Sequence, residues 1–159
     1  MANLQELEKV VLTGCEMLAA ANIGARRHIE STIKDRDSGK IGPGVPWKSA
    51  IEGALAEMAV AKHFNMYMDP ALGKFGEADV GTLHVRSTKW PNGKLRIGKE
   101  ERVGRYILVI GDLNTWHIAG WIDAEDGRRP EWLYAIKEDR PEPNFWVPQE
   151  ELDRDFSWI

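Results

Sequence analysis

Two carboxylates and two basic side chains in the middle of the sequence have residue types and spacing that suit chemistry on a phosphodiester. Glu57 lies in an apolar stretch, with Gly53 one helical turn before it, and Asp79 follows a glycine-rich segment. His84 and Arg86 come next, two residues apart, so that on a strand their side chains would share one face. A carboxylate in apolar surroundings is costly unless it is paired, hydrogen-bonded or bound to a metal ion.

These oxygen donors predict a site for a hard divalent cation. Mg²⁺ and Mn²⁺ suit oxygen ligands, and Mg²⁺ retains several waters. Two carboxylates from separate elements, together with a backbone carbonyl of the strand, would hold one ion. The ion would polarise the phosphodiester and lower the pKa of a bound water. A neighbouring cation would stabilise the charge that develops on the phosphate.

Two helices are expected in the N-terminal half of the chain. Apolar residues recur at three- to four-residue steps near the start, which predicts one long amphipathic helix over residues 4–34. Glycine and proline then interrupt the pattern. Ser49 followed three residues later by Glu52 has the pattern of a capping box. It predicts a second helix over residues 49–65, buried on most sides.

After Asp79 the spacing of apolar residues changes from about four to two, which predicts strands. The first has one solvent-facing side, and Pro91-Asn92-Gly93 predicts a hairpin turn into the second. The continuous apolar run at 106–110 indicates a central strand covered on both faces. The expected strands cover residues 83–88, 94–97, 106–110, 115–122 and, as a short edge strand, 145–147. This order predicts an α/β fold with two N-terminal helices packed on a mixed, mostly antiparallel sheet.

This frame resembles the PD-(D/E)XK nuclease superfamily, which combines a helix glutamate, an aspartate at the start of a hairpin and an acid-x-lysine on the next strand. More narrowly, four stretches of the sequence are similar to phage-associated members of this superfamily. They are Glu52-Gly53-Ala54-Leu55-Ala56-Glu57, Ala78-Asp79-Val80-Gly81, Val85-Arg86-Ser87-Thr88 and Gly120-Trp121-Ile122. It implies a restriction-endonuclease-like fold and a nuclease that uses Mg²⁺ or Mn²⁺. The metal ligands would be Glu57, Asp79 and His84, and the catalytic residues Glu57, Asp79, His84 and Arg86.

His84 and Arg86 depart from the superfamily pattern, in which an acid and a lysine stand at these positions. A neutral imidazole supplies no negative charge, so Mg²⁺ would be held less well and Mn²⁺ relatively better. Arginine does not release its proton at workable pH, so Arg86 would clamp a phosphate rather than act as a base. Two functions stay open: a metal-dependent nuclease acting on DNA, and an inactive nuclease-derived module that binds DNA or a protein.

The candidate residues also have structural explanations. Glu57 would equally be a buried acid paired with Arg26 or Arg27. Asp79 would serve as a turn residue, and His84 as an ordinary surface histidine. The histidines show no H-x-x-x-H spacing, which disfavours a zinc site.

Charge is unevenly distributed along the chain, whose net charge is −4. Residues 84–105 contain seven basic and two acidic residues, whereas residues 123–159 contain eleven acidic and five basic ones. A basic strip suits a phosphate-binding face, and a solvated surface of mixed charge is the alternative. Trp47 and Trp90 lie near this strip and would either stack on bases or pack at the rim of the core. We expect nucleic acid, DNA rather than RNA, to contact Arg86, Lys89, Lys94, Arg96, Lys99, Arg102 and Arg105.

The bulk properties indicate one domain over residues 1–159. Cys15 is the only cysteine, which excludes an internal disulfide and is typical of a reducing compartment. No signal-peptide pattern opens the sequence, and no apolar run approaches the ~20 residues of a membrane span. We therefore expect a soluble cytoplasmic protein without a membrane partner. Its strands and tryptophans would also suit a homodimer.

Overall fold

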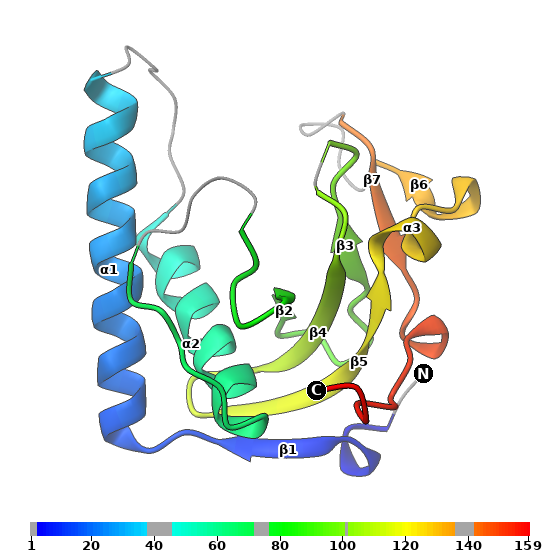
Figure 1. Cartoon of the computed structure of the whole chain (residues 1–159), viewed down its shortest axis with the longest axis horizontal. Coiled ribbons are helices and arrows are strands. Elements are labelled where there is room, and N and C mark those ends of the chain that lie inside the picture. Colours follow the sequence, from blue (N-terminus) through cyan, green and yellow to red (C-terminus); the bar gives the residue numbers. More distant parts are fainter. Residues whose placement is uncertain (1–2, 38–45, 72–76, 101, 136–141) are drawn as a thin grey trace.

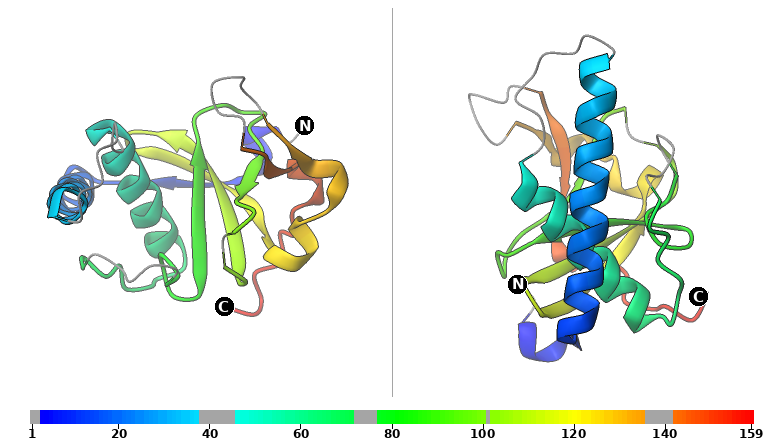
Figure 2. Two further views of the ribbon diagram at one scale, coloured as in Figure 1. Left: turned by 90° about the horizontal axis from the view of Figure 1, so that it is seen from above. Right: turned by 90° about the vertical axis from the view of Figure 1, so that its left-hand side faces the viewer.

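The structure is a computed structural model that describes residues 3–37, 46–71, 77–100, 102–135 and 142–159. Two helices lie on one face of a four-stranded sheet, and a smaller three-stranded sheet lies on the other side (Figures 1 and 2). The predicted α/β class and the mostly antiparallel strand pairing are confirmed. None of the helices in the described ranges combines the length and apolar character that crossing a bilayer requires.

The elements are placed as follows along the chain. The helices are α1 (Gly14–Asp37), α2 (Trp47–His63) and the short α3 (Ala124–Gly127). The larger sheet has the order β1-β5-β4-β2, formed by β1 (Glu8–Val11), β5 (Thr115–Asp123), β4 (Arg105–Asp112) and β2 (Leu83–Thr88). The smaller sheet has the order β3-β7-β6, formed by β3 (Leu95–Ile97), β7 (Asn144–Val147) and β6 (Leu133–Tyr134).

The strand β4 separates two apolar cores. Ile107 and Val109 pack in the core shared with α1 and α2, whereas Tyr106, Leu108 and Ile110 pack in the core shared with the smaller sheet. All five side chains are at most 1% exposed. The prediction of a central strand covered on both faces is therefore confirmed, and the two covered faces explain its continuous apolar sequence.

The first helix begins at Gly14, so the prediction of one helix over residues 4–34 is wrong at its N-terminal end. Residues 4–6 form a 3₁₀ turn, and β1 pairs antiparallel with β5. Glu16 Oε2 accepts the Thr13 N–H at 2.7 Å, and Thr13 Oγ1 accepts the Glu16 N–H at 3.2 Å. This reciprocal capping box starts α1. The apolar spacing before it serves a short strand whose partner lies far along the chain.

The second helix begins at Trp47 rather than at the predicted cap. Pro46 occupies the N-cap position without a side-chain hydrogen bond, and Ser49 lies exposed inside the first turn. Proline has a fixed φ and no N–H to satisfy, so it is tolerated at a helix start. Glu52 contacts a lysine one turn earlier instead of capping. The predicted end is confirmed, since the left-handed Asn65 (φ 53°) follows the helix.

The turn at residues 90–93 forms, but the predicted hairpin pairing across it is wrong. Gly93 N–H donates to the Trp90 carbonyl at 2.9 Å. The strand β2 then pairs in parallel with β4, and β3 pairs with β7 in the other sheet. The strand at 145–147 is also the middle strand of its sheet rather than an edge, because β6 lies on its second side.

The C-terminal segment approaches β5 closely at Gly120, next to the Trp121–Asp153 bridge, and this generates the first testable prediction. The φ of Gly120 is +141°, and a Cβ at this position would lie 2.7 Å from the Asp153 carbonyl oxygen. We expect Gly120→Ala to lower the free energy of unfolding by roughly 2–4 kcal/mol, from backbone strain and overpacking together. Urea unfolding followed by tryptophan fluorescence measures this change.

Gly53→Ala is the matched control for that variant. Gly53 lies inside α2, and a Cβ there would meet no atom within 4 Å. Alanine at such a helical site should raise the free energy of unfolding by about 0.4–1 kcal/mol. A Gly120→Ala protein as stable as the wild type would show that the approach of Asp153 does not constrain β5.

Candidate functional site

The structure places Glu57 on α2 in an ion pair with α1. Arg27 Nη1 lies 2.6 Å from Glu57 Oε2, and the two side chains are 20% and 13% exposed. Arg27 also donates to the carbonyl oxygens of Asp69 at 2.8 Å and Ala71 at 3.3 Å, which joins α1 to the segment after α2. The structural explanation of Glu57 as a paired acid is confirmed for Arg27, whereas Arg26 pairs within α1.

Burial raises the pKa of Glu57 from 4.5 to about 7, although the hydrogen-bonded ion pair with Arg27 favours the charged form. The Asp79 carboxylate raises this pKa further, and the Arg86 guanidinium lowers it. Glu57, Asp79 and Arg86 therefore belong to one electrostatic neighbourhood, as the sequence pattern predicts. Loss of solvent contact is the strongest influence on the pKa of Glu57.

Asp79 satisfies the backbone of the edge strand β2. Its Oδ2 accepts the Val85 N–H at 2.7 Å and lies 3.7 Å from Arg86 Nη1. Its own N–H donates to the Leu83 carbonyl at 2.8 Å, which closes a turn before the strand. The role of Asp79 as a turn residue is confirmed. The turn places the Asp79 carboxylate beside the Arg86 side chain.

His84 lies on the opposite side of β2 from α2. Its ring stacks on Tyr106 with centroids 4.6 Å apart, in the core shared with the smaller sheet, and the residue is 8% exposed. The solvent-facing side predicted for this strand is therefore wrong at His84, because Tyr106 and the chain at Gly104 lie against its ring. Arg86 leaves β2 on the same side, 5.1 Å from the Tyr106 ring centroid, yet its Nη1 reaches toward Asp79.

The predicted three-residue metal site is not assembled. Within the described ranges, His, Cys, Asp and Glu side chains nowhere form a group of three or more that could hold a metal ion. Glu57 and Asp79 are close enough to influence each other, but His84 is turned toward the smaller sheet. Any divalent ion here would have two protein carboxylates and would compete with Arg27 and Arg86 for them.

A cationic and aromatic groove lies between the end of β2 and the smaller sheet. Its volume is about 460 Å³. Three of its lining residues are basic, three are aromatic, and none of the described ones is acidic. The lining residues are Arg86, Ser87, Thr88, Trp90, Asn92, Gly93, Lys94, Arg96, Tyr134 and Trp146. Sequence reasoning selected the three basic residues but did not join them to Tyr134 and Trp146.

The far wall of this groove is formed by β3, β7 and β6. Lys94 Nζ donates to the Tyr134 hydroxyl at 3.0 Å, and Arg96 Nε donates to Asn144 Oδ1 at 3.3 Å. Trp146 Nε1 donates to the Tyr134 carbonyl at 3.1 Å. Phe145 and Val147, on either side of Trp146 in β7, are buried, and the two-residue period of a strand therefore places Trp146 on the other, groove-facing side.

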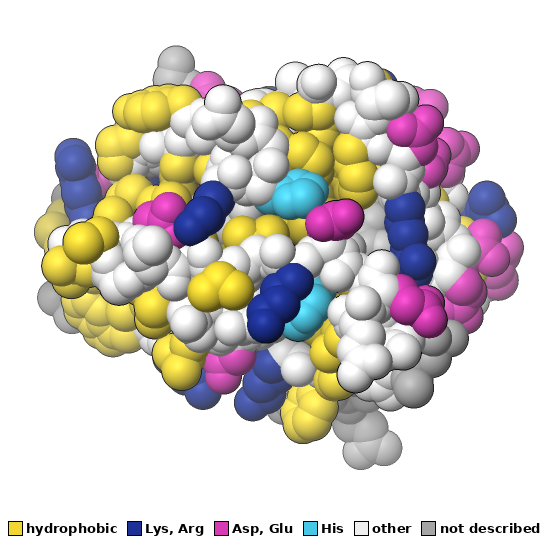
Figure 3. Space-filling view, turned by 90° about the horizontal axis from the view of Figure 1, so that it is seen from below, with side chains coloured by type: hydrophobic (Ala, Val, Ile, Leu, Met, Phe, Trp, Pro, Cys, Tyr) yellow, Lys and Arg dark blue, Asp and Glu magenta, His cyan; other side chains and the backbone are white. Residues whose placement is uncertain are grey.

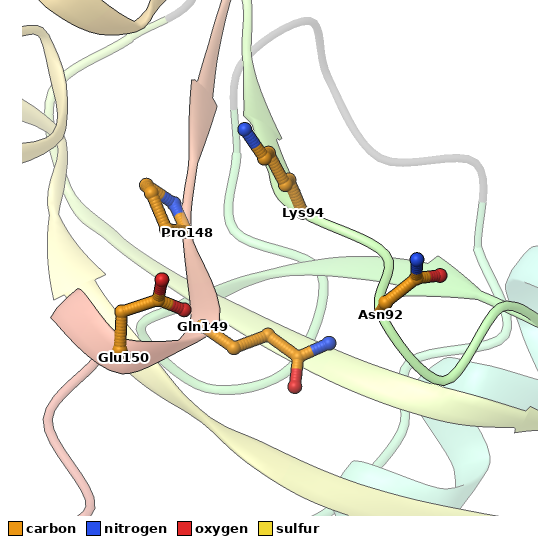
Figure 4. A pocket seen from close by; sticks show the side chains of 5 residues that line it. All are labelled: Asn92, Lys94, Pro148, Gln149 and Glu150. Carbon is orange, nitrogen blue, oxygen red and sulfur yellow. The ribbon is translucent and has the colours of Figure 1, made fainter. Parts of the chain in front are cut away.

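The near wall is the turn at residues 90–93, which Gln149 holds in place. Gln149 is 4% exposed, and its Nε2 donates to the carbonyl oxygens of Pro91 at 2.8 Å and Gly93 at 2.7 Å. Figure 4 shows its side chain extending toward the segment of Asn92, beside a hollow of about 210 Å³ that Lys94 also lines. Nothing in the sequence pattern singled out Gln149, because its partners are backbone groups 56 and 58 residues away.

The predicted basic strip is divided by the fold. Arg86, Lys94 and Arg96 line the groove, and Lys89 Nζ lies 5.3 Å from the ring centroid of the neighbouring Trp90. Arg105 pairs with Leu83 at the opposite end of β2 and lies 3.9 Å from the Trp158 ring centroid. Lys99 and Arg102 are exposed in the loop after β3 and do not line the groove.

Comparison with protein-family models, curated proteins and solved structures finds no match to this chain.

The raised pKa of Glu57 generates the second prediction. A folded-state pKa of about 7 against 4.5 means that the folded protein holds this proton more tightly than the unfolded chain. The stabilisation of the fold by the protonated Glu57 is fully present below pH 4.5 and is lost as pH rises through 7. We expect the unfolding free energy to fall by roughly 1–3 kcal/mol between pH 5 and 8, and Glu57→Gln to remove this fall.

Urea titrations at both pH values measure this difference. Glu52→Gln is the matched control, since Glu52 lies on the same helix with a side chain that is 38% exposed. It should keep the pH dependence of the wild type. If Glu57→Gln also keeps it, the dependence arises from other groups.

Proposed function

We propose that this protein binds nucleic acid in the groove between β2 and the smaller sheet. The observation that carries the proposal is the convergence of Arg86, Lys94 and Arg96 with three aromatic rings on one hollow. Phosphate groups provide the charge that such cations neutralise, and aromatic rings provide faces on which bases stack. Neither contact requires a metal ion.

The distribution of charged side chains supports binding of the nucleic-acid backbone at the groove rather than elsewhere on the surface. Acidic side chains gather on the rim that carries α3 and the neighbouring turns, with Lys and Arg side chains among them (Figure 3). This rim has mixed charge, including the Arg129–Glu151 ion pair, whereas the described groove lining offers cations alone among charged groups. The exposed acidic residues of these segments are Glu125, Asp126, Glu131, Glu150 and Glu151.

The third prediction concerns salt. Each neutralised phosphate releases counterions, so affinity for a labelled oligonucleotide should fall steeply as salt rises. Replacing Lys94 and Arg96 together by alanine should weaken binding and reduce the slope of log affinity against log salt by about 1 to 2. Fluorescence anisotropy between about 50 and 200 mM salt measures both quantities.

A double variant of Lys9 and Lys34 to alanine is the control for charge alone. Both lysines are exposed, and neither lines the groove. It removes the same net charge and should leave the slope nearly unchanged. Undetectable binding by the wild type, or affinity that does not change with salt, would contradict the proposal.

A metal-dependent nuclease is the second candidate function, favoured by the position of Arg86. This residue lines the groove and lies 3.7 Å from Asp79, so a phosphate bound there would lie close to the Glu57–Asp79 pair. Mg²⁺ is commonly held by one or two carboxylates together with substrate phosphates. The resemblance to the PD-(D/E)XK superfamily and its restriction-endonuclease-like fold supports the same pair as ligands.

The fourth prediction separates cleavage from binding. The described residues offer two carboxylates and no third acidic ligand, so cleavage of DNA should be faster with Mn²⁺ than with Mg²⁺. Asp79→Ala should abolish cleavage and leave groove binding largely intact, because Asp79 does not line the groove. Gel assays of single- and double-stranded DNA with each metal measure cleavage.

His84→Glu tests the departure from the superfamily pattern. Because His84 is buried against Tyr106, a glutamate there should destabilise the fold rather than improve Mg²⁺ binding. Binding by the wild type without cleavage in either metal would leave the binding function alone. Cleavage that persists unchanged in Asp79→Ala would place the active site elsewhere.

A further inference from the structure

Trp90 is an exposed tryptophan on a fixed backbone. The residue is 63% exposed. Its N–H donates to Thr88 Oγ1 at 3.2 Å, and its carbonyl accepts the Gly93 N–H at 2.9 Å. Gln149 holds the other end of the same turn through two hydrogen bonds. A large apolar side chain in water is costly, and here the surrounding hydrogen bonds keep its backbone in one position.

Two hollows meet at this residue. Trp90, Ser87 and Thr88 line both the groove of about 460 Å³ and a second hollow of about 180 Å³. The second hollow opens toward the start of α2 and the end of β4, and its charged lining is mixed: Lys48 and Lys89 with Glu52 and Asp112. The indole therefore stands between two concave surfaces rather than packing into the core.

We propose that the ligand of the groove is a single-stranded segment of nucleic acid, with one base stacked on Trp90 and its flanking phosphates at Lys94 and Lys89. This inference rests on the proposed nucleic-acid function and specifies its substrate class. Stacking on an aromatic ring is tolerant of sequence because every base has a π-face. Lys89 Nζ lies over one face of the Trp90 ring, 5.3 Å from its centroid, so the base would stack on the other face of the indole.

The shape of the site favours a single strand over a duplex. A duplex keeps the faces of its bases within the stack, so an indole cannot reach them without unpairing. Direct reading of duplex DNA in its major groove, which is about 12 Å wide, uses a protruding helix or β-ribbon. The cations of this site instead line a hollow in the protein.

Trp47 provides a matched comparison because it is also exposed but differently placed. It is 52% exposed and lies at the start of α2, with its ring centroid 4.4 Å from that of His28. It lines neither of the two hollows. Trp47→Ala therefore removes an exposed indole of the same chemistry from outside the proposed site.

The experiment compares four labelled ligands of equal length: oligothymidylate, oligouridylate, an abasic strand and a duplex. The abasic strand keeps the phosphates but has no base to stack. Wild-type protein should bind both base-bearing single strands more tightly than the abasic strand and the duplex. Trp90→Ala should weaken single-strand binding roughly 5- to 100-fold and remove the preference over the abasic strand. The single-strand affinity of Trp90→Phe should lie between those of the wild type and Trp90→Ala, and the affinity of Trp47→Ala should match that of the wild type.

The outcomes separate the two proposals. Absence of binding to all four ligands overturns the proposed nucleic-acid function. Salt-dependent binding that does not distinguish base-bearing from abasic strands, or that is unchanged in Trp90→Ala, leaves that function standing and overturns the stacking inference. Tighter binding of the duplex than of either single strand also overturns it. Circular dichroism of each variant confirms that a loss of binding is not a loss of fold.

Discussion

Parallel pairing of β2 with β4 requires the chain to return from one end of β2 to the other before β4 begins. Such connections usually contain a helix. Here residues 89–104 make the crossing with the turn at 90–93 and β3, and β3 pairs with β7 instead of β2. The crossing therefore starts the second sheet on the face away from the helices. The groove lies where the end of β2, this turn and the smaller sheet meet.

The same arrangement determines which charged groups meet. Side chains on alternate faces of β2 would normally separate Arg86 from α2, but β2 is an edge strand, and Arg86 Nη1 reaches Asp79. Glu57 has its own partner in Arg27 on α1. Each carboxylate of the predicted metal site thus has an arginine beside it. A metal ion would compete with these arginines for the two carboxylates, and burial already disfavours the charged form of Glu57. The proposed binding in the groove needs no metal ion.

Much of the local structure could be predicted because it depends on neighbours in the sequence. The apolar run of β4, the alternation of β5 and the end of α2 before Asn65 are set by periodicity and backbone preference over a few residues. The start of α1 belongs in this group as well, since Thr13 and Glu16 form a capping box visible in the sequence. The apolar spacing of the residues before it masked this signal.

The sequence by itself determined the α/β class, the buried central strand, and the acid at Glu57 whose burial demanded a partner. Only the tertiary structure decided that this partner is Arg27, that His84 packs on Tyr106, and that Trp90 stands at a groove rather than in the core. These outcomes depend on which strands pair and which face each sheet covers. Strand pairing joins residues far apart in the chain, and periodicity carries no information about the identity of a distant partner.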